Sequence, residues 1–149
     1  MMNIKQHKPS KKGRYQQGYI NPSSCKKLFQ SQSNEPIIFR SSYERAFVYW
    51  LENNPTVKRW ASECLEIPYM YIDGKIHRYY PDYIVEMENG DKIVVEIKPK
   101  NQTIKPINEN SIAYEMYIKN MCKWKAAKKY CDERGLKFQI ITENTISKL

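Results

Sequence analysis

The chain of 149 residues carries a formal net charge of +9, and a chain of this length can bury one hydrophobic core. The positive charge points to a polyanionic partner such as a nucleic acid, although a basic protein kept soluble by its charge is the alternative. No apolar run reaches membrane-spanning length, no signal-peptide segment is evident, and the four cysteines lack zinc-finger spacing. We therefore expect an intracellular, soluble protein with reduced thiols and no membrane partner.

Residues 1–36 form a polar segment, rich in Lys, Gln, Ser and Asn and without hydrophobic periodicity. Such composition predicts a basic, flexible N-terminal arm. An arm that tracks phosphates, a docking tail for a protein partner and a merely solvated terminus are all compatible with it. Residues 37–149 then make up a single domain.

The first helix is predicted to open at Ser41-Ser42 and to end at Asn53-Asn54-Pro55, with an apolar face at helical spacing between them. Glu44 in its first turn has two interpretations. Ser41-x-x-Glu44 matches a capping box, in which the glutamate satisfies a backbone N–H. The side chain could instead face the sheet and extend a metal site, but the local sequence favours the cap.

Strands follow. Residues 57–71 are rich in β-formers and predict one strand, and Asp73-Gly74 predicts a hairpin turn that returns along residues 76–80. Residues 83–87 continue as strand after Pro81, Asn89-Gly90 makes a second turn, and residues 92–98 form the most hydrophobic strand. We expect an antiparallel meander of about three strands.

A long helix is predicted over residues 111–134, with Gly135 as its C-terminal cap, and a last strand over 136–142. Lysines cover much of this helix outside its apolar stripe, which by itself is typical of a solvated face. The order helix, three strands, helix, strand predicts an α/β (α+β) domain in which helices flank one mixed sheet.

The chemistry of interest lies in Pro81-Asp82 and Glu96-Ile97-Lys98. Glu96 and Lys98 are two positions apart in a strand, so both side chains point to one face, and Asp82 can lie beside them across the hairpin. Two carboxylates suit Mg²⁺ or Mn²⁺, and Lys98 could orient or deprotonate a water that attacks a phosphodiester. A solvated strand face and an ordinary Pro-Asp turn are the alternative.

His77 and Arg78 stand just upstream and could contact the scissile phosphate, although a polar strand edge is equally compatible. The sequence lacks the phosphate-binding G-x-x-x-x-G-K-[ST] loop, which argues against a nucleotide hydrolase. It also lacks a G-x-S-x-G elbow for a covalent nucleophile. No small-molecule cofactor beyond a metal ion is expected.

These motifs together resemble the PD-(D/E)xK nuclease superfamily and, within it, the head-completion nucleases of T-even-like bacteriophages. The resemblance extends over segments 39–44, 60–63, 67–69, 73–82, 96–100 and 123–127. It implies a restriction-endonuclease-like αβββαβ core and shifts Glu44 toward a functional role. The implied catalytic residues are Glu44, Asp82, Glu96 and Lys98, with Asp82 and Glu96 as metal ligands. The implied nucleic-acid contacts are His77, Arg78, Lys100 and Lys123.

The same resemblance implies an Mg²⁺-dependent DNA endonuclease that acts on packaged DNA before tail joining. Phage head, portal or neck proteins would be its partners, in the host cytoplasm or within the virion. Transposon-end endonucleases resemble the same core, so that role stays open. A head-closure or DNA-binding protein without catalysis is the second class of function.

Overall fold

The computed structural model describes residues 18–29 and 36–146. The strands and helices of the central part are β2 (Ile37–Phe39), α1 (Ser42–Asn53), β3 (Val57–Ser62), β4 (Ile67–Met70), β5 (Ile76–Tyr79), β6 (Tyr83–Met87), β7 (Lys92–Ile97), α2 (Ile112–Glu133) and β8 (Lys137–Ile141). At the two ends lie β1 (Gly18–Ile20) and the short helix α3 (Glu143–Ile146), and a 3₁₀ turn, η3 (Lys100–Thr103), precedes α2. No helix in the described ranges is long and apolar enough to cross a membrane.

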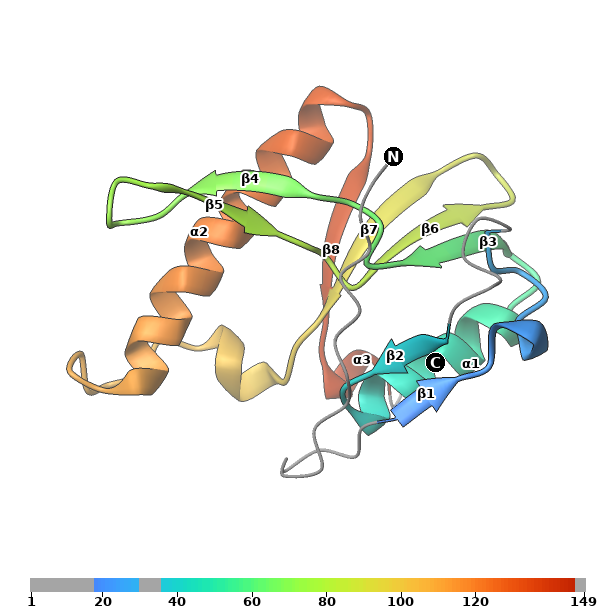
Figure 1. Cartoon of the computed structure of the whole chain (residues 1–149), viewed down its shortest axis with the longest axis horizontal. Coiled ribbons are helices and arrows are strands. Elements are labelled where there is room, and N and C mark those ends of the chain that lie inside the picture. Colours follow the sequence, from blue (N-terminus) through green and yellow to red (C-terminus); the bar gives the residue numbers. More distant parts are fainter. Residues whose placement is uncertain (1–17, 30–35, 147–149) are drawn as a thin grey trace.

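A four-stranded mixed sheet in the order β3-β6-β7-β8 forms the centre of the domain (Figure 1). β6 pairs antiparallel with both β3 and β7, whereas β8 pairs parallel with β7. The parallel pair is reached through α2, a crossover of the length that parallel strands require. The predicted α+β domain with a mixed sheet is confirmed.

The sheet is covered on both faces, and strand alternation decides which residue faces which helix. Val95 and Ile97 of β7 share a core cluster with Phe47 and Leu51 of α1. The second cluster joins Trp124 of α2 to side chains of β4, β5 and β8. Because neighbouring residues in a strand point to opposite faces, Glu96 lies on the α2 side of the sheet.

The strand predicted over residues 57–71 is two strands, and this prediction was wrong. β3 ends at Ser62, and the following Glu63 has a φ of 47°, which lies outside the range for a strand. β4 then pairs only with β5, in a separate two-stranded hairpin that packs on α2 (Figure 1). The three-stranded part of the large sheet is therefore β3-β6-β7, with the hairpin inserted between β3 and β6.

The local sequence signals for turns and helix caps predicted the structure better than the strand pattern over residues 57–71 did. Asp73-Gly74 and Asn89-Gly90 connect β4 to β5 and β6 to β7, and both glycines have positive φ. Ser111 caps α2 by accepting from the Tyr114 N–H at 3.1 Å, and Gly135 follows the helix with a φ of 68°. The two turns and the Gly135 cap are confirmed as predicted, because a turn or cap depends on a few consecutive residues.

Part of the expected N-terminal arm lies in the described structure. β1 pairs antiparallel with β2, and Leu28 forms a bridge to Trp60. The backbone N–H groups of Lys26 and Lys27 donate to the Glu52 carboxylate at 2.5 and 3.0 Å. Residues 18–29 thus contact the domain, while 1–17 and 30–35 lie outside the described residues, and the division at residue 36 stays a prediction.

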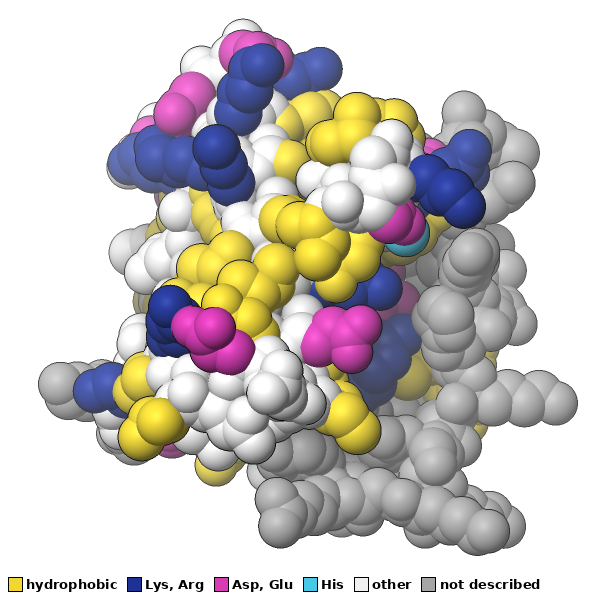
Figure 2. Space-filling model, turned by 90° about the vertical axis from the view of Figure 1, so that its left-hand side faces the viewer, with side chains coloured by type: hydrophobic (Ala, Val, Ile, Leu, Met, Phe, Trp, Pro, Cys, Tyr) yellow, Lys and Arg dark blue, Asp and Glu magenta, His cyan; other side chains and the backbone are white. Residues whose placement is uncertain are grey.

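One side of the molecule carries exposed apolar side chains. Among the described residues the large exposed ones on the β4–β5 hairpin and around the start of α2 are Met70, Ile72, Ile76, Ile104, Ile107, Ile112 and Met116. Figure 2 shows this side, with apolar side chains gathered over its centre, lysines and arginines at the upper left and upper right, and further basic and acidic side chains beside the apolar ones.

Trp60 should be a main contributor to stability, because it is fully buried between the sheet and α1 and its Nε1 donates to Glu52 at 2.8 Å. We predict that Trp60→Ala lowers the free energy of unfolding by about 3–5 kcal/mol through loss of packing. Urea denaturation measures this. Tyr49→Ala, at a side chain that is 73% exposed on α1, is the control and should change stability by less than about 0.5 kcal/mol. Similar losses for both variants would contradict the described packing.

Candidate active site

Three carboxylates from three elements come together where β6 begins and β7 ends. Asp82 directly precedes β6, Glu96 is the penultimate residue of β7, and Glu44 stands in the first turn of α1. Each lies close enough to the other two for its charge to raise a neighbour's pKa. The sequence interpretation placed Asp82 beside Glu96 across the hairpin, and the structure brings Glu44 to both.

Asp82 is anchored by the main chain of β7. Its Oδ2 accepts from the Ile97 N–H at 2.7 Å, and its backbone carbonyl accepts from the Glu63 N–H at 2.9 Å. The first bond ties the residue before β6 to the end of β7, next to Glu96. One carboxylate oxygen of Asp82 is thereby fixed, so that the other is the one available to a ligand.

Glu96 is buried, with 7% of its surface exposed, and both of its oxygens have partners. Oε2 accepts from the Tyr79 hydroxyl at 2.6 Å, and Oε1 lies 3.5 Å from the Lys98 Nζ. The predicted proximity of Glu96 and Lys98 on one strand face is thus present.

Glu44 combines the two interpretations that its sequence left open. Ser41 caps α1, since its Oγ accepts from the Glu44 N–H at 3.2 Å. The Glu44 carboxylate does not return to the Ser41 N–H, as a capping box requires, but accepts from the Arg40 N–H at 2.5 Å. This residue, also 7% exposed, therefore takes part in the helix start and in the acidic cluster.

The pKa values of all three carboxylates are raised above their ordinary values. Burial raises the pKa of Glu44 to about 6, and the charges of Glu63 and Glu96 add to the rise against the lowering effect of Arg40. Burial and the charges of Glu96 and Glu44 raise the pKa of Asp82 well above its usual range. Burial also raises the pKa of Glu96, although Lys98 opposes this. Grouped, buried carboxylates of this kind mark functional sites more often than structural ones.

This donor set fits a magnesium ion better than a closed metal cage. In the part of the chain that the structure describes, no three His, Cys, Asp or Glu side chains are arranged to enclose a metal ion. Mg²⁺ commonly binds through one or two carboxylates and fills its remaining positions with water and phosphate oxygens. Asp82 and Glu96 are oxygen donors of that type, and a divalent cation would offset the repulsion by Glu96 and Glu44 that raises the pKa of Asp82.

Lys123, expected to contact nucleic acid, also lies at this site. Its Nζ is 5.6 Å from the ring centroid of Tyr79, the residue that donates to Glu96. Burial lowers the pKa of Lys123, and the charges of Glu96 and Asp82 oppose that shift. The helix α2 thus brings a second cation to the carboxylates.

The other expected nucleic-acid contacts lie apart from the cluster. His77 is 2.8 Å from the Asp73 carboxylate and stacks on Tyr69 in the β4–β5 hairpin. Arg78 pairs with Glu66 at 3.0 Å with most of its side chain exposed. Lys100 is exposed in η3 beyond β7. Their assignment to nucleic acid stays a prediction.

Sequence reasoning missed two residues that support the carboxylates. Tyr79 holds Glu96, and Arg40 both donates to Glu44 and forms an ion pair with Glu63. Tyr79 stood inside the motif before Asp82, and its position in β5 was the available signal. The ion pair between Arg40 and Glu63 joins positions 23 residues apart and left no local pattern.

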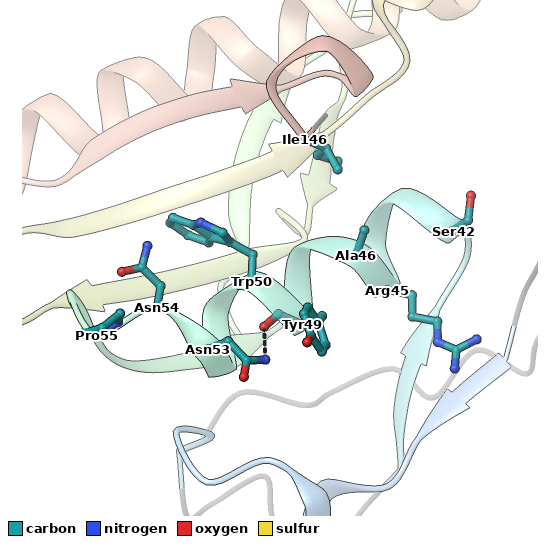
Figure 3. Close-up of a pocket in the computed structure, with 9 residues that line it drawn as sticks. All are labelled: Ser42, Arg45, Ala46, Tyr49, Trp50, Asn53, Asn54, Pro55 and Ile146. Carbon is teal, nitrogen blue, oxygen red and sulfur yellow. Dashed lines mark hydrogen bonds between the residues drawn. The ribbon is translucent and has the colours of Figure 1, made fainter. Parts of the chain in front are cut away.

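A hollow in the described structure lies elsewhere. It has a volume of about 760 Å³ and runs along the outer face of α1 to α3, from Ser42 and Arg45 to Pro55 and Ile146 (Figure 3). No carboxylate of the cluster lines it. The acidic cluster therefore belongs to the sheet edge rather than to this hollow.

Comparison with known proteins identifies the class. Residues 54–143, more than half of the chain, match the family described as TnsA-like endonuclease N terminal. The match contains Asp82, Glu96 and Lys98, whereas Glu44 precedes it. The chain belongs to this family of endonucleases, which confirms the resemblance found in the sequence.

A particular relative is the head completion nuclease of Enterobacteria phage T4. It is 36% identical to this chain, over 76% of this chain and 83% of the relative. The likeness therefore covers most of both proteins.

Glu44 should make folding stability depend on pH. Its pKa is higher in the folded chain, about 6, than the ordinary value of 4.5, so stability is lost as the pH rises through this interval. At 1.36 kcal/mol per pKa unit, ionisation of Glu44 costs about 2 kcal/mol. We predict that Glu44→Gln stabilises the protein at pH 8 by about this amount more than it does at pH 4.

Urea unfolding of both proteins at pH 4, 6 and 8, without divalent metal, measures this difference. Glu88→Gln, in the exposed turn between β6 and β7, is the control for loss of one carboxylate. An effect of Glu44→Gln that is the same at pH 4 and pH 8 would show that the burial of this carboxylate carries no cost.

Proposed function

We propose that this protein is an Mg²⁺-dependent DNA endonuclease whose site consists of Glu44, Asp82, Glu96 and Lys98. The observation that carries the proposal is the convergence of Asp82 with the two buried carboxylates Glu44 and Glu96, with Lys98 placed 3.5 Å from Glu96. The endonuclease family to which the chain belongs supports it. A purely structural domain has no reason to maintain this repulsive arrangement.

Each of the four residues would have a distinct role in cleavage. Asp82 and Glu96 would hold the metal, Asp82 through the oxygen that the Ile97 N–H leaves available. When bound there, Mg²⁺ supplies polarisation of a phosphoryl oxygen and a lowered pKa of bound water. Lys98 would orient the attacking water and offset the negative charge that develops on the phosphate. Glu44 would be the auxiliary acid that completes the cluster.

The biological setting is proposed from the relative. Because a T4 relative that covers most of the chain is a head completion nuclease, we infer that this protein acts in completion of a phage head. It would process packaged DNA before tail joining, beside portal or neck proteins, in the host cytoplasm or in the virion. DNA is its substrate in this proposal, in agreement with the net charge of +9.

The TnsA-like family match favours a second candidate, an endonuclease that cuts at transposon ends. The two candidates differ in substrate, because a transposon-end enzyme requires a defined end sequence or a partner that supplies one. Cleavage of plasmids without such ends supports the head-completion role, whereas cleavage confined to a defined end supports the second candidate.

Removal of either proposed metal ligand should abolish cleavage. Purified protein with Mg²⁺ should nick or linearise plasmid DNA, and EDTA should prevent this. We predict that Asp82→Asn and Glu96→Gln each lower the rate by about a hundredfold or more, as loss of a group that stabilises the transition state does. Glu88→Gln should cleave at the wild-type rate.

Circular dichroism establishes that each variant is folded. Cleavage by a folded Asp82→Asn or Glu96→Gln protein at the wild-type rate would overturn the assigned roles. Absence of cleavage by the wild-type protein, together with head completion by a folded Asp82→Asn protein, would support the non-catalytic head-closure role instead.

Tyr79 is expected to position Glu96. Tyr79→Phe keeps the ring but removes the 2.6 Å hydrogen bond, and we predict a roughly 10- to 100-fold loss of cleavage or of metal affinity. Raising the Mg²⁺ concentration should recover part of the loss. Tyr80→Phe, which removes a 2.9 Å hydrogen bond to Glu66 outside the cluster, is the matched control. Equal effects of the two substitutions would contradict a role of the Tyr79 hydroxyl in positioning Glu96.

A further inference from the structure

The lysines of α2 differ in whether their charge is neutralised. Near its C-terminal end, Lys128 lies 2.7 Å from Asp132 and Lys129 lies 4.0 Å from Glu133, each one turn further along the helix. These side chains are exposed, and their charge is balanced on the surface. They form the solvated, ion-paired face that a lysine-rich helix normally has.

Lys119 and Lys123 are held by aromatic rings instead. The Lys119 Nζ lies 5.7 Å from the ring centroid of Tyr71, and the Lys123 Nζ lies 5.6 Å from that of Tyr79. Among the described residues, no carboxylate is within ion-pairing distance of either ammonium group. A ring attracts a cation through its quadrupole but has no net charge, so the full positive charge remains available to a ligand.

The two lysines are one turn apart, so both side chains lie on the same face of α2. That face is turned toward the carboxylate cluster and the β4–β5 hairpin. Glu96, Asp82, Lys98 and Lys119 all act on the proton affinity of Lys123, the first two raising its pKa and the two lysines lowering it. The Tyr79 ring that holds Lys123 carries the hydroxyl that donates to Glu96. Lys123 and Lys119 therefore form a row of two cations that leads away from Glu96 along α2.

Two cations without a carboxylate partner among the described residues, beginning next to the proposed site of phosphodiester cleavage, match successive phosphates of a nucleic-acid strand. We propose that Lys123 and Lys119 bind successive phosphates of one DNA strand. This strand leads away from the carboxylate cluster along α2, beside the β4–β5 hairpin. This proposal rests on the proposed endonuclease function for the identity of the strand. The ligand is the phosphate backbone, so these contacts carry no sequence preference.

The ion-paired lysines supply a matched control. Lys119→Gln/Lys123→Gln and Lys128→Gln/Lys129→Gln remove the same two charges from the same helix. Binding of a fluorescently labelled DNA duplex is followed by anisotropy in EDTA at several salt concentrations, so that the DNA stays intact. Each phosphate contact on duplex DNA contributes about 0.9 to the slope of log K against log salt.

We expect the Lys119/Lys123 variant to bind more weakly and with a slope smaller by about 1.8, because two phosphate contacts are lost. The Lys128/Lys129 variant should keep the wild-type slope. Lys119→Arg/Lys123→Arg should restore the slope, since arginine keeps the charge. Equal slopes for the two glutamine variants would overturn the proposal.

If the double variant does not fold, the single substitution Lys119→Gln tests the proposal. Its side chain is exposed, so Lys119→Gln alone leaves the core intact and should lower the slope by about 0.9, whereas Lys128→Gln should not. Equal slopes for these two single variants would also overturn the proposal.

The proposed endonuclease function and the proposed phosphate contacts of Lys119 and Lys123 can be refuted independently of each other. A wild-type protein that does not cleave DNA, but whose binding depends on Lys119 and Lys123, would retain the phosphate row without the catalysis. Cleavage by the wild-type protein, with no difference between the two lysine pairs, would retain the endonuclease and reject the row.

Discussion

The burial of like-charged carboxylates at one edge of the sheet is the constraint on which the other features of the structure depend. Burial raises the pKa values of Glu44, Asp82 and Glu96, and repulsion by neighbouring carboxylates adds to the rise for Glu44 and Asp82. Hydrogen bonds oppose these effects, from the Arg40 and Ile97 N–H groups among others. Each carboxylate is thus stabilised in its ionised form by a neighbour that the fold has to place.

Those neighbours come from elements that are distant in the chain. Tyr79 belongs to the hairpin that packs on α2, and Lys123 belongs to α2 itself. Glu44 belongs to α1, on the opposite face of the sheet. The cluster can therefore form only when both helices are docked, which couples the site to both cores. A site of this kind costs stability, which is the usual relation between an active site and the fold that carries it.

The same electrostatics separates the lysines of α2. A lysine next to an acidic residue one turn away forms a surface pair of small energetic value. Lys123 lies instead on the ring of Tyr79, next to the carboxylate cluster. The lysine-rich helix therefore carries two kinds of lysine, those paired with acidic residues and those held by aromatic rings.

Local sequence determined much of this protein. The alternation of β7 put Glu96 and Lys98 on one face, the Asn-Gly and Asp-Gly turns placed two hairpins, and Ser41 marked the start of α1. These features depend on residues a few positions apart, and the local conformational preferences of those residues are sufficient to specify them.

Only the tertiary structure decided the rest. It divided residues 57–71 between two sheets, brought Glu44 to Asp82 and Glu96, and placed Tyr79 and Lys123 beside them. Strand pairing and helix docking join residues that lie far apart in the chain, so their free energy appears in no local pattern. The motif of Asp82, Glu96 and Lys98 could be recognised from the sequence, whereas the residues that surround it in space were decided by the fold.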